Sequence, residues 1–235
     1  MLTRQPLPIL DFLANLQTFD IVVMKGLLVT SMEAQAITNS NWSHVGMVVV
    51  AGDIGLPGVD PTSRLYWEAN TADTAVDLLS GKLKEGPQLV YLIDRIQHNF
   101  WVKYDGAYMA RKLMINRQPS MIDTLKSVID FAKNGTLPYT GDNQAVELTN
   151  FLAGRFYNKA SAANQYACSQ LVAYTYMELG LLSKYYVTNS YTPADFTEEV
   201  DVSLLQGAWL GREIYLDTNT LAPAPPDYKP GSPNK

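Results

Sequence analysis

Cys168 is the only cysteine of the chain, and its place in the sequence suits nucleophilic chemistry. Residues at helical spacing predict a helix that begins close to it, with Asn164 as the N-cap. In the first turn of a helix, unpaired N–H groups and the positive end of the helix dipole favour a thiolate. The alternative is that Cys168 is a small apolar residue that packs this helix into the core. The shared face comprises Cys168, Leu171, Val172, Thr175, Tyr176 and Leu179.

The bases available to such a thiol are few, because the chain has two histidines, His44 and His98. His44 opens the predicted strand 44–51. The next predicted strand, 64–70, carries Glu68, which approaches His44 across the pair in the obvious hairpin register. The structural alternatives are a satisfied core histidine and a solvated strand glutamate. His98 has no strand or cysteine beside it in sequence, and we assign it no role.

Two further features are candidates for substrate contact. Gly46 follows His44 on the same strand face, where a missing side chain lets another backbone or a substrate come close. A glycine bulge is the alternative reading of that residue. The tyrosines within 185–191 follow the cysteine helix and could line a groove, although packing explains tyrosines equally well.

The composition bounds the classes of function. The 235 residues are 47% hydrophobic and 17% charged, which is typical of a globular chain. The net charge of −5, without a long Lys/Arg run, argues against a nucleic-acid partner. One cysteine excludes an intramolecular disulfide and, with only two histidines, argues against a structural zinc site. The oligomeric state is not encoded in any of these features.

The chain shows no membrane or export segment at the level of sequence. No apolar run approaches the ~20 residues that a membrane span requires. The start, 1–16, contains Asp11 within its apolar run and lacks a cleavage motif, so we predict a short helix there. As the sequence stands the expectation is a cytoplasmic protein, with export only if a signal has been removed.

The predicted elements follow one another without an internal repeat. We expect a single domain over 1–217 and a Pro-rich, disordered tail over 218–235. The predicted strands are 20–24, 44–51, 64–70, 87–93 and 213–216, with 100–104 and 108–115 as weaker candidates. The predicted helices are 9–16, 31–37, 119–133, 145–153 and the cysteine helix, with a helical turn starting at Pro193.

Three motifs stand in a defined order along the chain. They are Ser43-His44-Val45-Gly46, Tyr66-Trp67-Glu68-Ala69 and Tyr166-Ala-Cys-Ser-Gln-Leu171. In this order they resemble the circularly permuted branch of the NlpC-type papain-like superfamily, the YiiX/YaeF-like proteins, where the histidine precedes the cysteine. The resemblance covers most of 19–196. Two departures are Gln170, at a position that is commonly acidic, and a longer 52–63 region.

The resemblance implies an α+β fold of papain-like type, with an antiparallel sheet or barrel packed against helices and the nucleophile at a helix N-terminus. It implies that Cys168 is the nucleophile. His44 would act as base and then as acid toward the leaving group, and Glu68 would orient its ring.

The oxyanion of such a reaction needs hydrogen-bond donors. We expect the backbone N–H of Cys168 to be one of them, and the side chain of Tyr166 or Tyr66 to assist. Gly46 completes the predicted substrate and oxyanion group. We expect neither a cofactor nor a metal.

The sequence therefore predicts a cysteine hydrolase or acyltransferase that cleaves an amide, ester or thioester through an acyl-enzyme. The expected partner is a small molecule, a cell-wall peptide or a lipid-like acyl compound. One alternative is a non-catalytic module on the same fold that holds a lipid or peptide. Another is a structural protein in which Cys168 belongs to the core.

Overall fold

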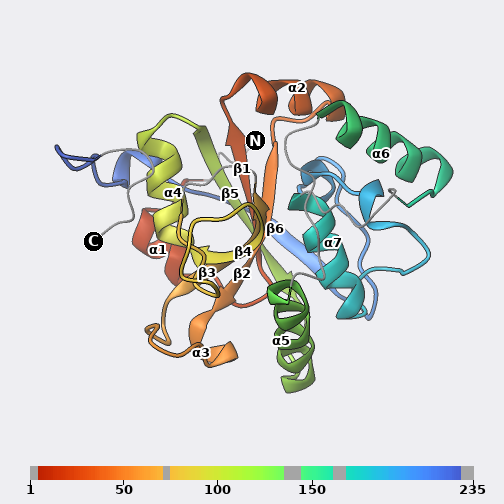
Figure 1. Cartoon of the computed structure of the whole chain (residues 1–235), viewed down its shortest axis with the longest axis horizontal. Helices are drawn as coiled ribbons and strands as arrows, with labels where there is room; N and C mark the ends of the chain where they lie inside the picture. Colours follow the sequence, from red (N-terminus) through yellow and green to blue (C-terminus); the bar gives the residue numbers. More distant parts are fainter. Residues whose placement is uncertain (1–4, 71–74, 135–143, 161–167, 229–235) are drawn as a thin grey trace.

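The chain forms a six-stranded antiparallel sheet with helices on both faces, which confirms the predicted α+β class (Figure 1). The structure is a computed structural model that describes residues 5–70, 75–134, 144–160 and 168–228. The strand order is β4-β3-β2-β1-β5-β6. The strands are β1 (Ile21–Gly26), β2 (His44–Val50), β3 (Arg64–Asn70), β4 (Gly86–Tyr91), β5 (Asp105–Met114) and β6 (Trp209–Tyr215).

The helices differ widely in length and in what they cover. The two that matter most for the site are α4 (Leu92–Trp101) and α7 (Cys168–Glu178). None of the helices in the described ranges is both long and apolar enough to cross a membrane. The others are α1 (Ile9–Ala14), α2 (Val29–Thr38), α3 (Ala51–Ile54), α5 (Pro119–Lys133) and α6 (Gln144–Tyr157), with 3-10 turns η1 (Thr188–Ser190), η2 (Pro193–Phe196) and η3 (Thr218–Thr220).

The sheet buries both of its faces, so its central strands are apolar along most of their length. Successive side chains alternate between the faces. In β2, for example, Val45 and Met47 belong to one buried cluster and Val48 to the other. Covering both faces leaves two separate apolar cores with the sheet between them.

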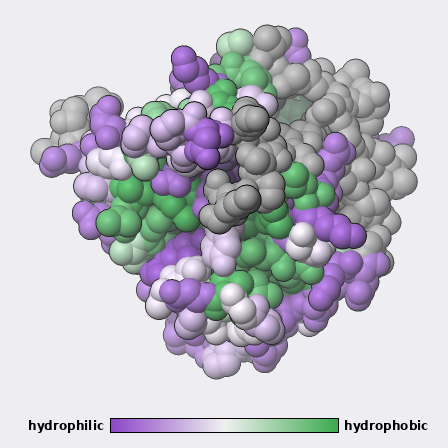
Figure 2. Space-filling view, turned by 60° about the vertical axis from the view of Figure 1, so that its left-hand side comes forward, coloured by the Kyte–Doolittle hydropathy of each residue, from purple (hydrophilic) through white to green (hydrophobic). Residues whose placement is uncertain are grey.

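One core, here called the α7-side core, joins the sheet to α5 and α7. The other, the α4-side core, joins the opposite face to α1 and α4. Figure 1 shows α1 and α4 on one side of the sheet and α5, α6 and α7 on the other. In Figure 2 the α1 and α4 side comes forward, and apolar residues gather there between polar ones.

The strand predicted for 100–104 is wrong, because Phe100 and Trp101 end α4 and a turn follows. The strand predicted for 87–93 ends at Tyr91, where α4 begins. Leu92 and Ile96 are both fully buried, and their spacing of four places them on the helix face that packs on the sheet. This packing stabilises a helix here, although the local alternation of apolar and polar residues is typical of a strand.

The tail predicted as disordered makes specific contacts over 218–228. Leu221 is buried, and the Trp101 indole Nε1 donates to the Ala222 carbonyl at 2.7 Å. The Tyr228 ring meets Trp101 edge-on, with centroids 4.8 Å apart. Aromatic contacts of this kind offset the entropy lost on ordering a Pro-rich segment. Residues 229–235 lie outside the described ranges.

Candidate active site

The structure brings His44 and Glu68 together, as the hairpin register predicts. Strands β2 and β3 are antiparallel with Met47 opposite Trp67, so His44 and Glu68 share a face at a diagonal position. The His44 Nε2 lies 2.6 Å from the Glu68 Oε2. The side chain of His44 is 19% exposed and that of Glu68 is fully buried. The remaining ring nitrogen, Nδ1, is free to face a third group.

The group that acts most strongly on the imidazole is the Cys168 thiol, whose charge and hydrogen bond raise the pKa of His44. Cys168 is the first residue of α7 and is half-buried. The helix is fixed to the sheet by the Trp67 indole, which donates to the Thr175 hydroxyl at 3.2 Å. The predicted helix face is confirmed, since its members beyond Cys168 are all buried. The predicted N-cap, Asn164, lies outside the described residues.

The side chains of Cys168 and Glu68 shift the protonation of His44 strongly. Burial by itself lowers the pKa of His44, because it desolvates the imidazolium. The charge and hydrogen bond of Cys168, followed by those of Glu68, outweigh burial and raise the pKa of His44 to about 10. The ring is therefore an imidazolium at neutral pH.

Glu68 has two more partners that the sequence analysis did not include. Arg95, on α4, places Nε 2.7 Å and Nη2 2.5 Å from the other carboxylate oxygen, Oε1. The Gln88 side chain of β4 donates to the same oxygen at 3.2 Å. Burial raises the pKa of Glu68, but the opposing effects of Arg95 and then His44 are together larger, so the pKa of Glu68 lies below its ordinary value. Glu68 is thus a carboxylate at neutral pH.

Arg95 and its neighbours were detectable in the sequence. Leu92, Arg95, Ile96 and Asn99 fall at i, i+3, i+4 and i+7, which places two polar residues on an apolar helix face. All four are buried. A buried arginine on such a face requires an acidic partner. That signal was missed because the segment was divided between two predicted strands.

Gly46 is next to the site, but the space at its Cα is taken by Tyr66 rather than open to a substrate. A Cβ at Gly46 would lie 2.5 Å from the Tyr66 Cζ and 2.8 Å from the Trp67 carbonyl oxygen. The Tyr66 hydroxyl donates to the Val22 carbonyl at 2.9 Å. Its proton is therefore engaged, and the oxyanion role of Tyr66 stays a prediction. Tyr166 lies outside the described residues.

The second histidine has a different partner. His98 lies on α4, where its Nδ1 contacts the Tyr228 hydroxyl. Burial, aided by the charge of Arg95, lowers the pKa of His98 to about 4. His98 is therefore a neutral imidazole that is hydrogen-bonded to the tyrosine hydroxyl. It belongs to the packing of the C-terminal segment through its contact with Tyr228.

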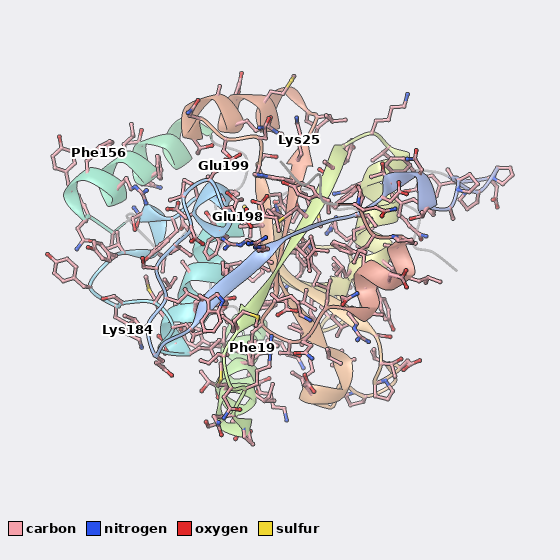
Figure 3. The ribbon with its side chains drawn as sticks, turned by 180° about the vertical axis from the view of Figure 1, so that it is seen from behind. Phe19, Lys25, Phe156, Lys184, Glu198 and Glu199 are labelled. Carbon is pink, nitrogen blue, oxygen red and sulfur yellow. The ribbon has the colours of Figure 1, made fainter. Side chains whose placement is uncertain are left out.

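The tyrosine-rich segment that follows α7 is linked to the start of that helix. The Ser169 hydroxyl, next to Cys168, donates to the Tyr191 carbonyl at 2.8 Å. Tyr191 is 8% exposed, whereas Tyr185 is 74% exposed. Asn158, just after α6, donates to the Tyr185 carbonyl at 2.8 Å. Phe156 projects outward from α6 (Figure 3) and is 72% exposed.

The chain is thus an α+β protein in which a histidine of β2 is bound to a glutamate of β3 and lies near the cysteine of α7. Among solved structures, one similar to it is the metalloprotein YiiX of Escherichia coli O157:H7, with a TM-score of 0.41 and 18% identity. The alignment covers 69% of this chain and 66% of that chain. The chain matches no protein-family profile and no curated protein sequence. Within its described residues, no group of three or more His, Cys, Asp or Glu side chains is placed to hold a metal ion.

Proposed function

We propose that this chain is a papain-like cysteine hydrolase or acyltransferase, with Cys168 as nucleophile, His44 as proton carrier and Glu68 as its orienting carboxylate. The observation that carries the proposal is the position of His44 between the other two groups. Its Nε2 is bound to Glu68 at 2.6 Å, and the Cys168 thiol is near enough for its charge and a hydrogen bond to raise the pKa of His44. The order of the three residues along the chain agrees with the permuted NlpC-type resemblance.

In the proposed reaction the Cys168 thiolate attacks the substrate carbonyl carbon and forms a C–S bond. The tetrahedral oxyanion accepts a hydrogen bond from the Cys168 backbone N–H, at the start of the described part of α7. The bond to the leaving nitrogen, oxygen or sulfur then breaks, and His44 Nδ1–H protonates that atom.

The second half of the reaction returns the enzyme to its starting state. Once His44 has given up its proton, it can accept one from water or from a second alcohol, amine or thiol. The activated nucleophile attacks the thioester carbonyl, the C–S bond breaks, and Cys168 leaves as thiolate. Glu68 keeps Nε2 as the donating nitrogen throughout, which leaves Nδ1 as the atom that exchanges protons. Water gives hydrolysis, and another nucleophile gives acyl transfer.

The proposal is tested with activated esters, thioesters and peptide amides of graded acyl size. We expect a covalent mass increase equal to the acyl group in the quenched wild-type protein, located on Cys168. Cys168→Ser and His44→Gln should abolish the adduct, while His98→Gln, which removes the other histidine, should retain it. An unchanged turnover rate in Cys168→Ser would refute the scheme.

A binding module on the same fold is the second candidate, and one observation favours it. The Tyr66 hydroxyl donates to the Val22 carbonyl, so its proton is already engaged beside the site. This alternative predicts ligand retention without turnover. Mass spectrometry of small molecules released from the denatured protein, compared with Cys168→Ala, distinguishes the two.

A further inference from the structure

The carboxylate of Glu68 is held from two sides at once. One oxygen, Oε2, binds His44, and the other, Oε1, binds Arg95 through two nitrogens at 2.7 and 2.5 Å. The side chains of Glu68 and Arg95 are both 0% exposed. Contacts to both oxygens leave the carboxylate little freedom to rotate about its terminal bond. Its orientation toward His44 therefore depends on Arg95 as well as on β3.

The position of Arg95 is fixed by the α4-side core. Its neighbours on the helix, Leu92 and Ile96, are fully buried in that core. The guanidinium is thus carried to Glu68 by a packed helix, and not by a mobile loop. Burying two charges is costly in free energy unless they pair with good geometry. A pair retained at this cost beside a reactive histidine calls for a reason beyond packing.

We propose that Arg95 is a positioning residue of this site, which keeps Glu68 ionised and turns its Oε2 toward the His44 ring. The benefit of this positioning for catalysis rests on the proposed function, whereas the effect of Arg95 on the protonation of His44 does not. Without the guanidinium, Glu68 would be a buried carboxylate with only Gln88 on Oε1. Desolvation would then favour the neutral acid, which holds an imidazolium poorly.

The other charged and titratable groups around this pair come from neighbouring elements. Asp105 of β5 is buried, accepts from the Asn99 amide at 2.7 Å, and senses the charges of both Arg95 and His44. Cys168 of α7 and Tyr66 of β3 lie near His44. Asp105 is thus the one other carboxylate among these groups that Arg95 could serve. Asp105→Asn is therefore needed as a comparison.

The experiment measures the titration of His44 by NMR of the ring carbons in the full-length protein. Arg95→Met should lower the His44 midpoint by about 1 pH unit or more, the usual effect of a lost ionic partner. Arg95→Lys, which retains the cation, should recover part of that loss. Arg111→Met is the matched control, since Arg111 is also buried and pairs with an acidic residue, Asp201, at 2.7 Å. It should leave His44 unchanged.

A double variant separates action through Glu68 from a direct effect. In a Glu68→Gln background, Arg95→Met should no longer change the His44 midpoint. An equal change in both backgrounds, an unchanged midpoint in folded Arg95→Met, or an effect reproduced by Asp105→Asn would overturn the proposal. If Arg95→Met does not fold, the NMR signal of the Glu68 carboxyl carbon is followed against pH in the wild-type protein. Glu68 should remain a carboxylate at pH values below the ordinary titration range of glutamate. A neutral Glu68 at those pH values would refute the inference.

The outcome is independent of turnover. Absence of an acyl adduct in the wild-type protein would contradict the proposed function while leaving the His44 titration intact. A normal adduct together with an Arg95-independent His44 would contradict only the role of Arg95.

Discussion

Removing the thiol of Cys168 should return His44 toward an ordinary histidine, and the size of the change follows from the site. The pKa of His44 lies about 3.5 pH units (10 minus 6.5) above its ordinary value. That difference corresponds to about 5 kcal/mol of preference for the protonated ring, at about 1.4 kcal/mol per unit. Cys168 contributes more to the rise than Glu68 does. We therefore expect Cys168→Ala to lower the midpoint by about 2 pH units or more, to about 8 or below.

The assay is the pH titration of the two histidine ring signals, in the wild-type protein and in Cys168→Ala. The signals assign themselves, because His98 should titrate at about 4 and His44 at about 10. His98 is also the internal control, since its midpoint should be the same in both proteins. A wild-type His44 that titrates near 6.5 would refute the thiol–imidazole pairing. A midpoint that stays near 10 in Cys168→Ala would show that the thiol is not its cause.

Three further outcomes are expected. Gly46→Ala should lower the free energy of unfolding in urea by about 1–3 kcal/mol, because the added methyl group would overlap Tyr66. Gly211→Ala is the control, since the nearest atom to its added methyl group is 3.4 Å away, and equal losses in both variants would contradict the overlap. Glu68→Gln should lower the free energy of unfolding by about 3–5 kcal/mol, because it leaves the charge of Arg95 unpaired. The Glu68→Leu/Arg95→Met double variant should recover much of this loss. No recovery would mean that the loss does not come from the unpaired charge. The pKa of His98 is about 4 in the folded protein, below its value near 6.5 in the unfolded chain, so the neutral ring stabilises the fold fully above pH 6.5, and this stability is lost as the pH falls toward 4. His98→Phe should weaken the dependence of the urea midpoint on pH over this range. An unchanged pH dependence would contradict the reasoning.

The elements governed by local periodicity could be read from the sequence. Strand β3 and helix α5 occupy the predicted residues. The buried face of α7 follows the predicted spacing, because its period of 3.6 is set by one core. The contact of His44 with Glu68 was predictable too, since a hairpin register determines which side chains meet.

What the sequence did not reveal depends on contacts between distant segments. Arg95 meets Glu68 only because α4 packs back on the sheet, and the local pattern suggested strands on either side of it. Tyr228 is ordered by His98 and Trp101, which lie far from it along the chain. The loss of space at Gly46 likewise comes from the Tyr66 ring of the neighbouring strand. Composition and spacing carry no information on such long-range contacts.

The two cores have a consequence for how the proposed activity would respond to heating. Cys168 belongs to the α7-side core, whereas Arg95 is carried by a helix of the α4-side core, and His44 at the end of β2 connects them. Release of either layer would separate the proposed nucleophile from His44, or Glu68 from Arg95. Loss of the proposed activity would then require only partial unfolding, of the kind that opens at lower free energy than the whole molecule. We expect the temperature of half-activity to be set by the weaker of the two layers and to lie below the temperature at which the sheet itself unfolds.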